Sequence, residues 1–276
     1  MKPRMTRTRS IAILALVAVA YVAITTLYLL GARDVADEDA PPPPSGGVLV
    51  SLDLDGLRGE TYSLETRVSI EPDAALLDST GELTGAVTVE VRPAANTGTA
   101  TFAQGTRAGS APVTLYLDGD IRQWPFDRYE AAGLTVVATI DDGTGRTTVP
   151  VAVTVTDSMP SWVTGLVDDG TGPVTITAER TTETVAFAVV LCLVLVALPV
   201  LTLFVSVATL LGRKQFLPPI VTWFAVMLFA VLPIRNLFPG APPLGSRVDY
   251  VVVLWVVFGL AVSLVLYVTA WWRQGP

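Results

Sequence analysis

Trp124-Pro125-Phe126-Asp127-Arg128-Tyr129 lies midway between an apolar N-terminal segment and a longer apolar C-terminal block. The proline restricts φ and makes a stiff corner, in either the cis or the trans form. The aromatic side chains on both sides of it are suited to holding that corner against a sheet. Asp127 would then be presented at a fixed place, with Arg128 beside it. Two interpretations stay open: a structural corner of a β domain, or a point that couples this domain to a membrane.

The composition indicates a membrane protein with one exported domain. Of the 276 residues, 51% are hydrophobic, and the excess falls in four blocks. Each block approaches the roughly 20 apolar residues that cross a bilayer, and about 150 residues remain for one compact domain. The lack of histidine excludes Ser-His-Asp and Cys-His catalysis and histidine-ligated zinc. Because no phosphate-binding loop or nucleophile–base pair occurs either, we expect no enzyme, no metal site and no cofactor. The single cysteine, Cys192, allows no intrachain disulfide.

The N-terminal region predicts an anchor followed by a spacer. Residues 1–10 are basic, and the apolar run over 11–30 is longer than the 7–15 residues of a typical signal-peptide core. We therefore expect an uncleaved transmembrane helix over 11–30 with its basic flank in the cytoplasm. Residues 31–47 are acidic and contain four consecutive prolines, which favour an extended linker.

Residues 48–184 predict an extracytoplasmic antiparallel β-sandwich, because apolar side chains alternate with polar ones. The clearest alternating sets are Leu64, Val68 and Ile70; Val87, Val89 and Val91; Val113, Leu115 and Leu117; and Val149, Val151, Val153 and Val155. Pro150 indicates an edge strand or a bulge. Asp-Gly pairs at 55–56, 118–119, 142–143 and 169–170 are typical of hairpin turns. Calcium binding at these aspartates is an alternative, although the EF-hand spacing is absent.

The C-terminal block predicts three more spans. We expect transmembrane helices over 185–211, where Pro199 should cause a kink, over 216–234 and over 250–271. Arg213 and Lys214 place the first connection in the cytoplasm, so residues 235–249 form an extracytoplasmic loop and 272–276 a cytoplasmic tail. The fold class is then an α+β protein of the inner (plasma) membrane, with four helices and both termini cytoplasmic.

Charge suggests how the domain meets the membrane. Residues 33–184 contain 24 acidic and 9 basic side chains, a net charge of −15, which excludes binding of nucleic acid by phosphate neutralisation. The loop 235–249 carries Arg235, Arg247 and Asp249. Its bases either form a positive cap at the bilayer edge or receive Asp127 in an ion pair that orients the domain.

Two resemblances follow from these residues. The order of the spans, the Trp124–Tyr129 stretch and the loop sequence Pro239-Gly240-Ala241-Pro242-Pro243-Leu244-Gly245 followed by Asp249 resemble an actinobacterial membrane protein family catalogued as domain of unknown function 4436. That resemblance covers nearly the whole chain and implies a mycobacterial or related cell envelope, but no activity.

The aromatic-Pro-Phe-Asp string is also similar to the signature of pentameric (Cys-loop-like) ligand-gated channels. The likeness implies that Asp127 faces the membrane, that Pro199 matches the proline of the first channel helix, and that 235–247 is the contacting loop. The sequence departs from that family in its extra first span and in the absence of a fourth helix after the third. The segment Ile220–Val231 has one hydroxyl among bulky apolar side chains, which is poor for a wet pore.

The sequence thus leads to two functional hypotheses. The first is a non-enzymatic membrane protein whose sandwich binds an envelope component, with the lipid bilayer and an envelope protein or lipid as partners. The alternative is a channel-like oligomer related to the pentameric receptors.

Overall fold

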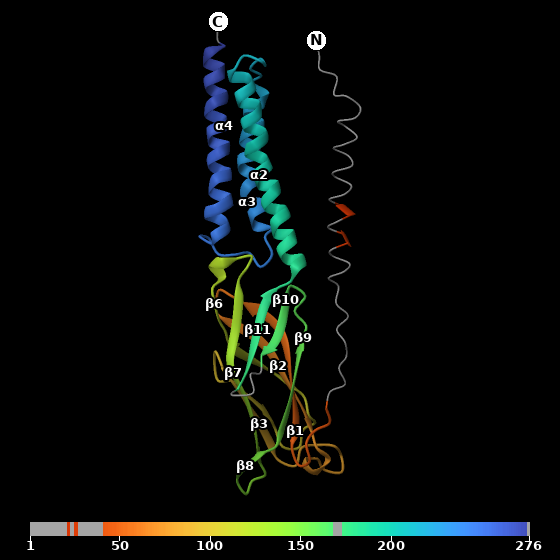
Figure 1. Ribbon diagram of the computed structural model, residues 1–276. Coiled ribbons are helices and arrows are strands. Elements are labelled where there is room, and N and C mark those ends of the chain that lie inside the picture. Colours follow the sequence, from red (N-terminus) through yellow and green to blue (C-terminus); the bar gives the residue numbers. More distant parts are fainter. Residues whose placement is uncertain (1–20, 23–24, 27–40, 168–172, 275–276) are drawn as a thin grey trace.

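The computed structural model describes residues 21, 22, 25, 26, 41–167 and 173–274. A β domain occupies one end of the long molecule and three helices occupy the other (Figure 1). Of the predicted helix over 11–30, only residues 21, 22, 25 and 26 are described, and these are helical; its other residues and most of the predicted linker over 31–47 lie outside the described residues. The first strand begins at Val48, immediately after Gly47 donates a backbone hydrogen bond to the Pro44 carbonyl.

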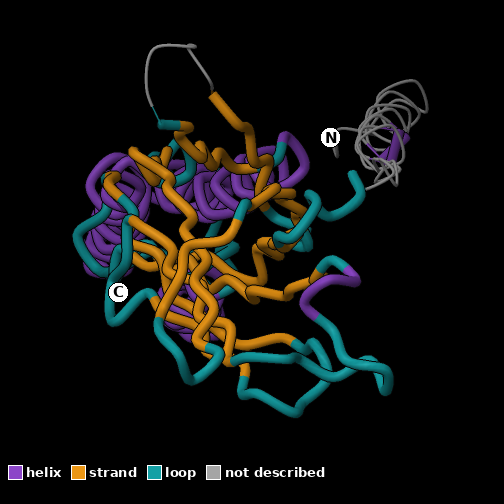
Figure 2. Tube along the Cα trace, turned by 90° about the horizontal axis from the view of Figure 1, so that it is seen from below, coloured by secondary structure: helices purple, strands orange, loops and turns teal. Residues whose placement is uncertain are grey.

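The β domain consists of two sheets. The smaller has the strand order β5-β2-β1-β9, and the larger has the order β10-β11-β7-β3-β4, with β6 and β8 also paired to β7. Seen along the long axis, the strands lie in front of the helices, so sheets and helices are stacked end to end (Figure 2). The strands are β1 (Val48–Arg58), β2 (Ser63–Pro72), β3 (Ala86–Arg92), β4 (Thr99–Phe102), β5 (Ser110–Tyr116), β6 (Asp118–Gly119), β7 (Arg128–Asp141), β8 (Arg146–Val149), β9 (Val151–Asp157), β10 (Trp162–Val167) and β11 (Val174–Arg180); short 3-10 turns, η1 (Ala74–Leu76) and η2 (Ile121–Gln123), interrupt them.

The core is built by the alternation that predicted the strands. Each residue of the 64, 68 and 70 set, the 87, 89 and 91 set and the 113, 115 and 117 set is at most 7% exposed. The fourth set does not share one face. Pro150 cannot donate to the ladder, so β8 ends before it and β9 continues in the other sheet, where Val153 is 41% exposed.

The sandwich is not wholly antiparallel. Strand β9 runs parallel to β1 at the edge of the smaller sheet, while all other named pairs are antiparallel. The difference follows from the crossing at Pro150, because the chain enters the smaller sheet beside Val48, at the start of β1 rather than through a hairpin.

Only one described Asp-Gly pair forms the expected hairpin turn. Asp142-Gly143 joins β7 to β8, and Gly143 has φ +87°, which suits glycine. Asp55-Gly56 instead lies inside β1 at a register shift, and Asp118-Gly119 forms β6. The pair at 169–170 lies outside the described residues. Among the described residues, an Asp-Gly pair therefore lies at a bulge or in a short strand twice and in a hairpin turn once.

The three helices are α2 (Thr182–Leu210), α3 (Pro219–Asn236) and α4 (Leu254–Arg273), and a π-helical turn, η3 (Asp249–Val253), leads into α4. All three are long and apolar enough to cross a membrane. Helix α2 follows β11 after the single residue Thr181, whose hydroxyl accepts a hydrogen bond from the Thr184 N–H and caps the helix.

Helices α2 and α4 pack closely through small and hydroxyl side chains. Pro199 lies within the continuous helix α2, and a Cβ on Gly259 would come 2.8 Å from the Pro199 Cβ. Thr202 Oγ1 is 3.1 Å from Ser263 Oγ, and Ser206 Oγ donates to the Ser263 carbonyl at 2.7 Å. Such contacts hold apolar helices together where burial of apolar surface gives no driving force.

Candidate functional site at the junction of the sandwich and the helices

The corner predicted from the sequence lies at the end of the sandwich nearest the helices (Figure 1). The 3-10 turn η2 leads into it and begins at Asp120, whose carboxylate accepts hydrogen bonds from the backbone N–H and the Nε of Arg122. The side-chain hydrogen bond from Arg122 lowers the pKa of Asp120. The peptide bond between Trp124 and Pro125 is cis. The chain then enters β7, so the corner is fixed on both sides by regular structure.

Trp124 belongs to the core of the helices although it comes from the β domain. Its side chain is 1% exposed and packs in one cluster with apolar residues of α2, α3 and α4. The Trp124 and Phe238 ring centroids are 4.7 Å apart, and Phe238 lies in the loop between α3 and α4. The indole Nε1–H donates to the Pro239 carbonyl at 2.9 Å. A single side chain thus provides both apolar contact and a directed hydrogen bond across the boundary.

Asp127 forms a buried, two-pronged ion pair with Arg180. Arg180 Nε and Nη2 donate to Asp127 Oδ1 and Oδ2 at 2.5 and 2.9 Å, and the two side chains are 5% and 0% exposed. The Tyr129 hydroxyl also donates to Oδ2 at 3.2 Å. Burial is the main cause that raises the pKa of Tyr129, and the negative charge of Asp127 raises it further. The Arg180 guanidinium lies 4.5 Å over the ring of Trp162.

Arg180 and Trp124 converge on one carbonyl. Arg180 Nη1 donates to the Pro239 oxygen at 3.4 Å, so that oxygen accepts from both residues. The next residue, Gly240, has φ +70°, and a Cβ there would come 3.0 Å from Arg180 Nη1. Arg180 is the last residue of β11, two positions before α2 begins. We call Trp124, Asp127, Arg180, Phe238 and Pro239 the junction cluster.

A second ion pair shapes the α3–α4 loop. Arg235, near the end of α3, donates from Nε and Nη2 to both carboxylate oxygens of Asp249 at 3.1 and 3.0 Å, and from Nη2 to the Pro242 carbonyl at 2.7 Å. The Gly245 N–H donates to Asp249 Oδ2 at 2.8 Å. These bonds close the loop on itself, which presents Phe238 and Pro239 to the corner in a defined shape.

Of the two interpretations of the basic loop, the pairing of Asp127 with Arg235 or Arg247 is wrong. Asp127 pairs with Arg180, Arg235 pairs with Asp249, and Arg247 is exposed. A buried ion pair must have good geometry and satisfied hydrogen bonds. The Asp127–Arg180 pair meets this condition within the β domain, and the Arg235–Asp249 pair meets it within the helical part. The contacts that cross the boundary are the hydrogen bond and ring packing of Trp124 and the longer hydrogen bond from Arg180 to the Pro239 carbonyl.

The other predicted residues play lesser parts at the junction. Pro125 is half-buried behind Trp124, and Phe126 is 68% exposed. Arg128 points to solvent and pairs with Glu179 at 3.3 Å. Sequence reasoning missed Arg180, Trp162, Phe238 and Pro239. The available signal was the position of Arg180, a single base between an alternating strand and the apolar run of α2.

Of the aspartates considered for calcium, those that the structure describes are engaged elsewhere or lie apart, and Asp169 lies outside the described residues. In the described part of the chain, no group of three or more His, Cys, Asp or Glu side chains comes close enough to hold a metal ion. Asp120 is bound to Arg122, Thr156 donates to Asp53, and Thr144 donates to Asp142. A surface hollow beside the corner is lined by Asp118, Asp120, Phe126, Arg128 and Glu130, a mixture of charges without a convergent set.

Comparison with known proteins divides the chain at the junction. Residues 37–185 match the family described as Domain of unknown function (DUF4436). Residues 180–274 match a second family, Domain of unknown function (DUF8686). No curated protein matches the sequence. The two matches overlap over residues 180–185, so Arg180 is the first residue that both share.

Proposed function

This chain belongs to the family described as Domain of unknown function (DUF4436), and we propose that it is a non-enzymatic, membrane-anchored binding protein. Its sandwich stands outside the plasma membrane in a fixed orientation and binds a protein or lipid of the cell envelope. Three apolar helices support the membrane anchor. Arg213 and Lys214, in the connection between α2 and α3, support a cytoplasmic position for that end.

The observation that carries this proposal is the buried junction cluster. A domain that only needed a tether could be attached to its membrane helices by a flexible linker alone. Here β11 passes directly into α2, Trp124 is inserted into the helix core, and the Asp127–Arg180 pair is buried. Contacts of this kind favour a sandwich with a fixed orientation above the bilayer. A fixed orientation serves a protein that must present one surface to a partner at a set height.

The junction itself is a poor candidate for chemistry. Its polar atoms are paired with each other, and its interior is filled by Trp124, Phe238 and Trp162. A partner would instead meet the exposed end of the sandwich, where the β7–β8 hairpin lies far from the helices (Figure 1).

Site-specific photo-crosslinking in cells tests the proposal. A photoreactive residue replaces Thr147 in β8, which is exposed at the far end, or Phe126, which is exposed beside the junction. We expect Thr147 to capture a specific envelope protein or lipid, and Phe126 to capture membrane lipid. Recovery of no specific product from Thr147, from neighbouring exposed positions of the hairpin, or from the intact domain would contradict the binding function.

A channel-like oligomer is a second proposal, favoured by one contact. The aromatic-Pro-Phe-Asp corner meets the loop between the last two helices, as the resemblance to pentameric channels implies. The exposed side chains of α3 include Val226, Phe229 and Leu232, which disfavour a wet pore. Native mass measurement in lipid-like detergent separates the two proposals. A ring-shaped oligomer with ion flux in liposomes would support the channel, and monomers alone would remove it.

A further inference from the structure

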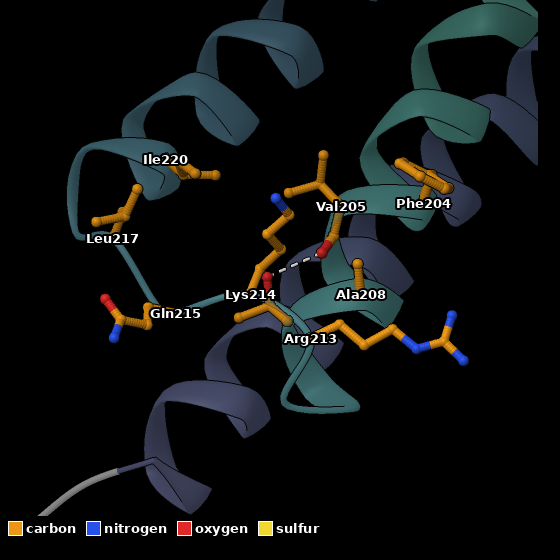
Figure 3. A pocket seen from close by; sticks show the side chains of 9 residues that line it. Phe204, Val205, Ala208, Arg213, Lys214, Gln215, Leu217 and Ile220 are labelled. Carbon is orange, nitrogen blue, oxygen red and sulfur yellow. Dashed lines mark hydrogen bonds between the residues drawn. The ribbon is translucent and has the colours of Figure 1, made fainter. Parts of the chain in front are cut away.

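A groove lies between α2 and α3 at the end of the helices remote from the sandwich. Its volume is about 590 Å³. The side chains of Phe204, Val205, Ala208 and Ile220 give it apolar walls. Arg213 and Lys214 also line it, with Lys214 extending toward Val205 and Arg213 extending past Ala208, away from Lys214 (Figure 3). The groove is thus apolar along the two helices and has two positively charged residues at one end.

Lys214 is an exposed residue whose side chain extends over this groove. In Figure 3 its side chain extends from the α2–α3 connection toward Val205, along the direction in which the helices run. A lysine at the end of a membrane helix ordinarily extends its ammonium toward water. Held beside apolar helices, this exposed ammonium is placed to attract an anion that carries an apolar chain.

The helical part of the chain offers no carboxylate side chain for this role. From Thr184 to Pro276 the sequence has one acidic residue, Asp249, and that residue is bound to Arg235 near the sandwich. Within residues 173–274, neither Arg213 nor Lys214 forms a salt bridge. The anion that complements these two bases must therefore come from outside the helices.

The connection that carries Lys214 is held in place by α4. The Tyr267 hydroxyl accepts from the Leu217 N–H at 3.0 Å and lies 3.1 Å from the Leu217 carbonyl. Gln274 accepts from the Phe216 N–H at 2.9 Å and donates to the Thr209 carbonyl at 2.7 Å and the Lys214 carbonyl at 3.2 Å. A backbone fixed in this way positions the base before any ligand arrives, which lowers the entropic cost of binding.

From these observations we infer that the groove is a binding site for an anionic phospholipid. The headgroup phosphate lies against Lys214, Arg213 adds a second positive charge to the same end of the groove, and an acyl chain lies along Phe204, Val205 and Ile220. Basic pockets between membrane helices are known to suit anionic headgroups. A free phosphate would satisfy the charges but would leave the apolar walls unfilled, so the apolar length of the groove favours a lipid. The inference depends on the three helices crossing a membrane and is independent of what the sandwich binds.

Native mass spectrometry of the purified full chain tests this site. The protein is titrated with dioleoyl phosphatidylglycerol or, at equal concentration, dioleoyl phosphatidylcholine. We expect preferential retention of phosphatidylglycerol, and about fivefold weaker retention after Lys214→Gln, since one base near the headgroups contributes an attraction of that order. Inorganic phosphate should not displace the lipid.

Two further variants make the result specific. Arg273→Gln removes an equal charge from the same end of the molecule without touching the groove, and should leave retention unchanged. Ala208→Phe keeps both charges but fills the apolar part of the groove. It should weaken the retention of phosphatidylglycerol as Lys214→Gln does. Equal retention of the two lipids, equal losses in Lys214→Gln and Arg273→Gln, or displacement by inorganic phosphate would each overturn the inference. Unchanged thermal unfolding of each variant shows that the fold is intact.

Discussion

Two ion pairs lie side by side where β7 begins and β11 ends, and they have opposite surroundings. Asp127 and Arg180 have side chains that are 0% and 5% exposed, whereas their neighbours Arg128 and Glu179 are 74% and 52% exposed. The register of β7 and β11 places Arg128 opposite Glu179. Because successive side chains point to opposite faces of a strand, one pair faces the helices and the other faces water.

The difference indicates which of the two ion pairs contributes to the stability of the fold. The exposed pair is in contact with water and salt, so its attraction is small. The buried pair has lost its water and is held by two guanidinium bonds and the Tyr129 hydroxyl. Removing one member of such a pair leaves the other charge buried without a counter-charge. The orientation of the sandwich on the helices should therefore depend on Asp127 far more than on Arg128.

The largest expected effect comes from Asp127→Asn. This change keeps the shape of the side chain but leaves the Arg180 guanidinium buried without its carboxylate. We expect the free energy of unfolding to fall by about 3–5 kcal/mol. Chemical denaturation of the full chain in detergent, followed by circular dichroism, measures it. Arg128→Gln is the matched control, and an equal loss in the two variants would show that burial does not distinguish the pairs.

Trp124→Phe should have the next largest effect. The substitution keeps an aromatic ring against Phe238 but removes the donor to Pro239, whose oxygen then retains only the 3.4 Å contact from Arg180. Loss of one partner from a buried polar group costs about 1–3 kcal/mol. The same denaturation experiment measures the change.

Trp255→Phe is the control for that variant, because Trp255 is 64% exposed on α4. It should change the free energy of unfolding by no more than about 0.5 kcal/mol. A Trp124→Phe protein as stable as Trp255→Phe would mean that the indole hydrogen bond contributes nothing to joining the two modules.

The strands and helices could be predicted from the sequence, but the residues that contact one another at the junction could not. Alternating valines predicted strands because only period two buries one face of a sheet, and the three long apolar runs predicted helices because each is long enough to cross a bilayer. The position of the corner beside the α3–α4 loop also followed, from its resemblance to a known motif. These are properties of local sequence or of one recognisable stretch.

The pairing of Asp127 could not be predicted in the same way. Its partner Arg180 is 53 residues away, and the two meet only because of the register between β7 and β11. The position of Arg180 before the apolar run of α2 marks it as a residue of the boundary, but nothing in the local pattern pairs it, rather than one of the other eight bases of residues 33–184, with Asp127. The parallel pairing of β9 escaped prediction for a related reason, since Pro150 signals an interruption but not which sheet the chain enters next.

A smaller effect, confined to alkaline pH, should arise from Tyr129. Burial and the nearby Asp127 charge raise the pKa of its hydroxyl above the ordinary value of about 10. The folded protein therefore holds this proton more tightly than the unfolded chain, so the stabilisation is complete below about pH 10 and is lost as the pH rises beyond it. Unfolding measured from pH 7 upward should show this decline.

Tyr129→Phe provides the comparison for that measurement, because it removes the titrating group and keeps the ring that packs on Trp162. Its free energy of unfolding should decline less steeply above pH 10 than that of the parent protein. Parallel curves for the two proteins would mean that the Tyr129 hydroxyl is not shielded by the junction.

The smallest expected effect concerns the exposed pair, and it sharpens the contrast with the buried one. Arg128→Gln and Glu179→Gln, alone and together, form a double-mutant cycle on two side chains 3.3 Å apart. The coupling free energy should be about 0.2–1 kcal/mol and should shrink in high salt, because exposed charges are screened. A coupling of several kcal/mol that salt does not reduce would place Arg128 and Glu179 in the same class as Asp127 and Arg180. The orientation of the sandwich would then depend on charge at both faces of the strands, and not on the buried face alone.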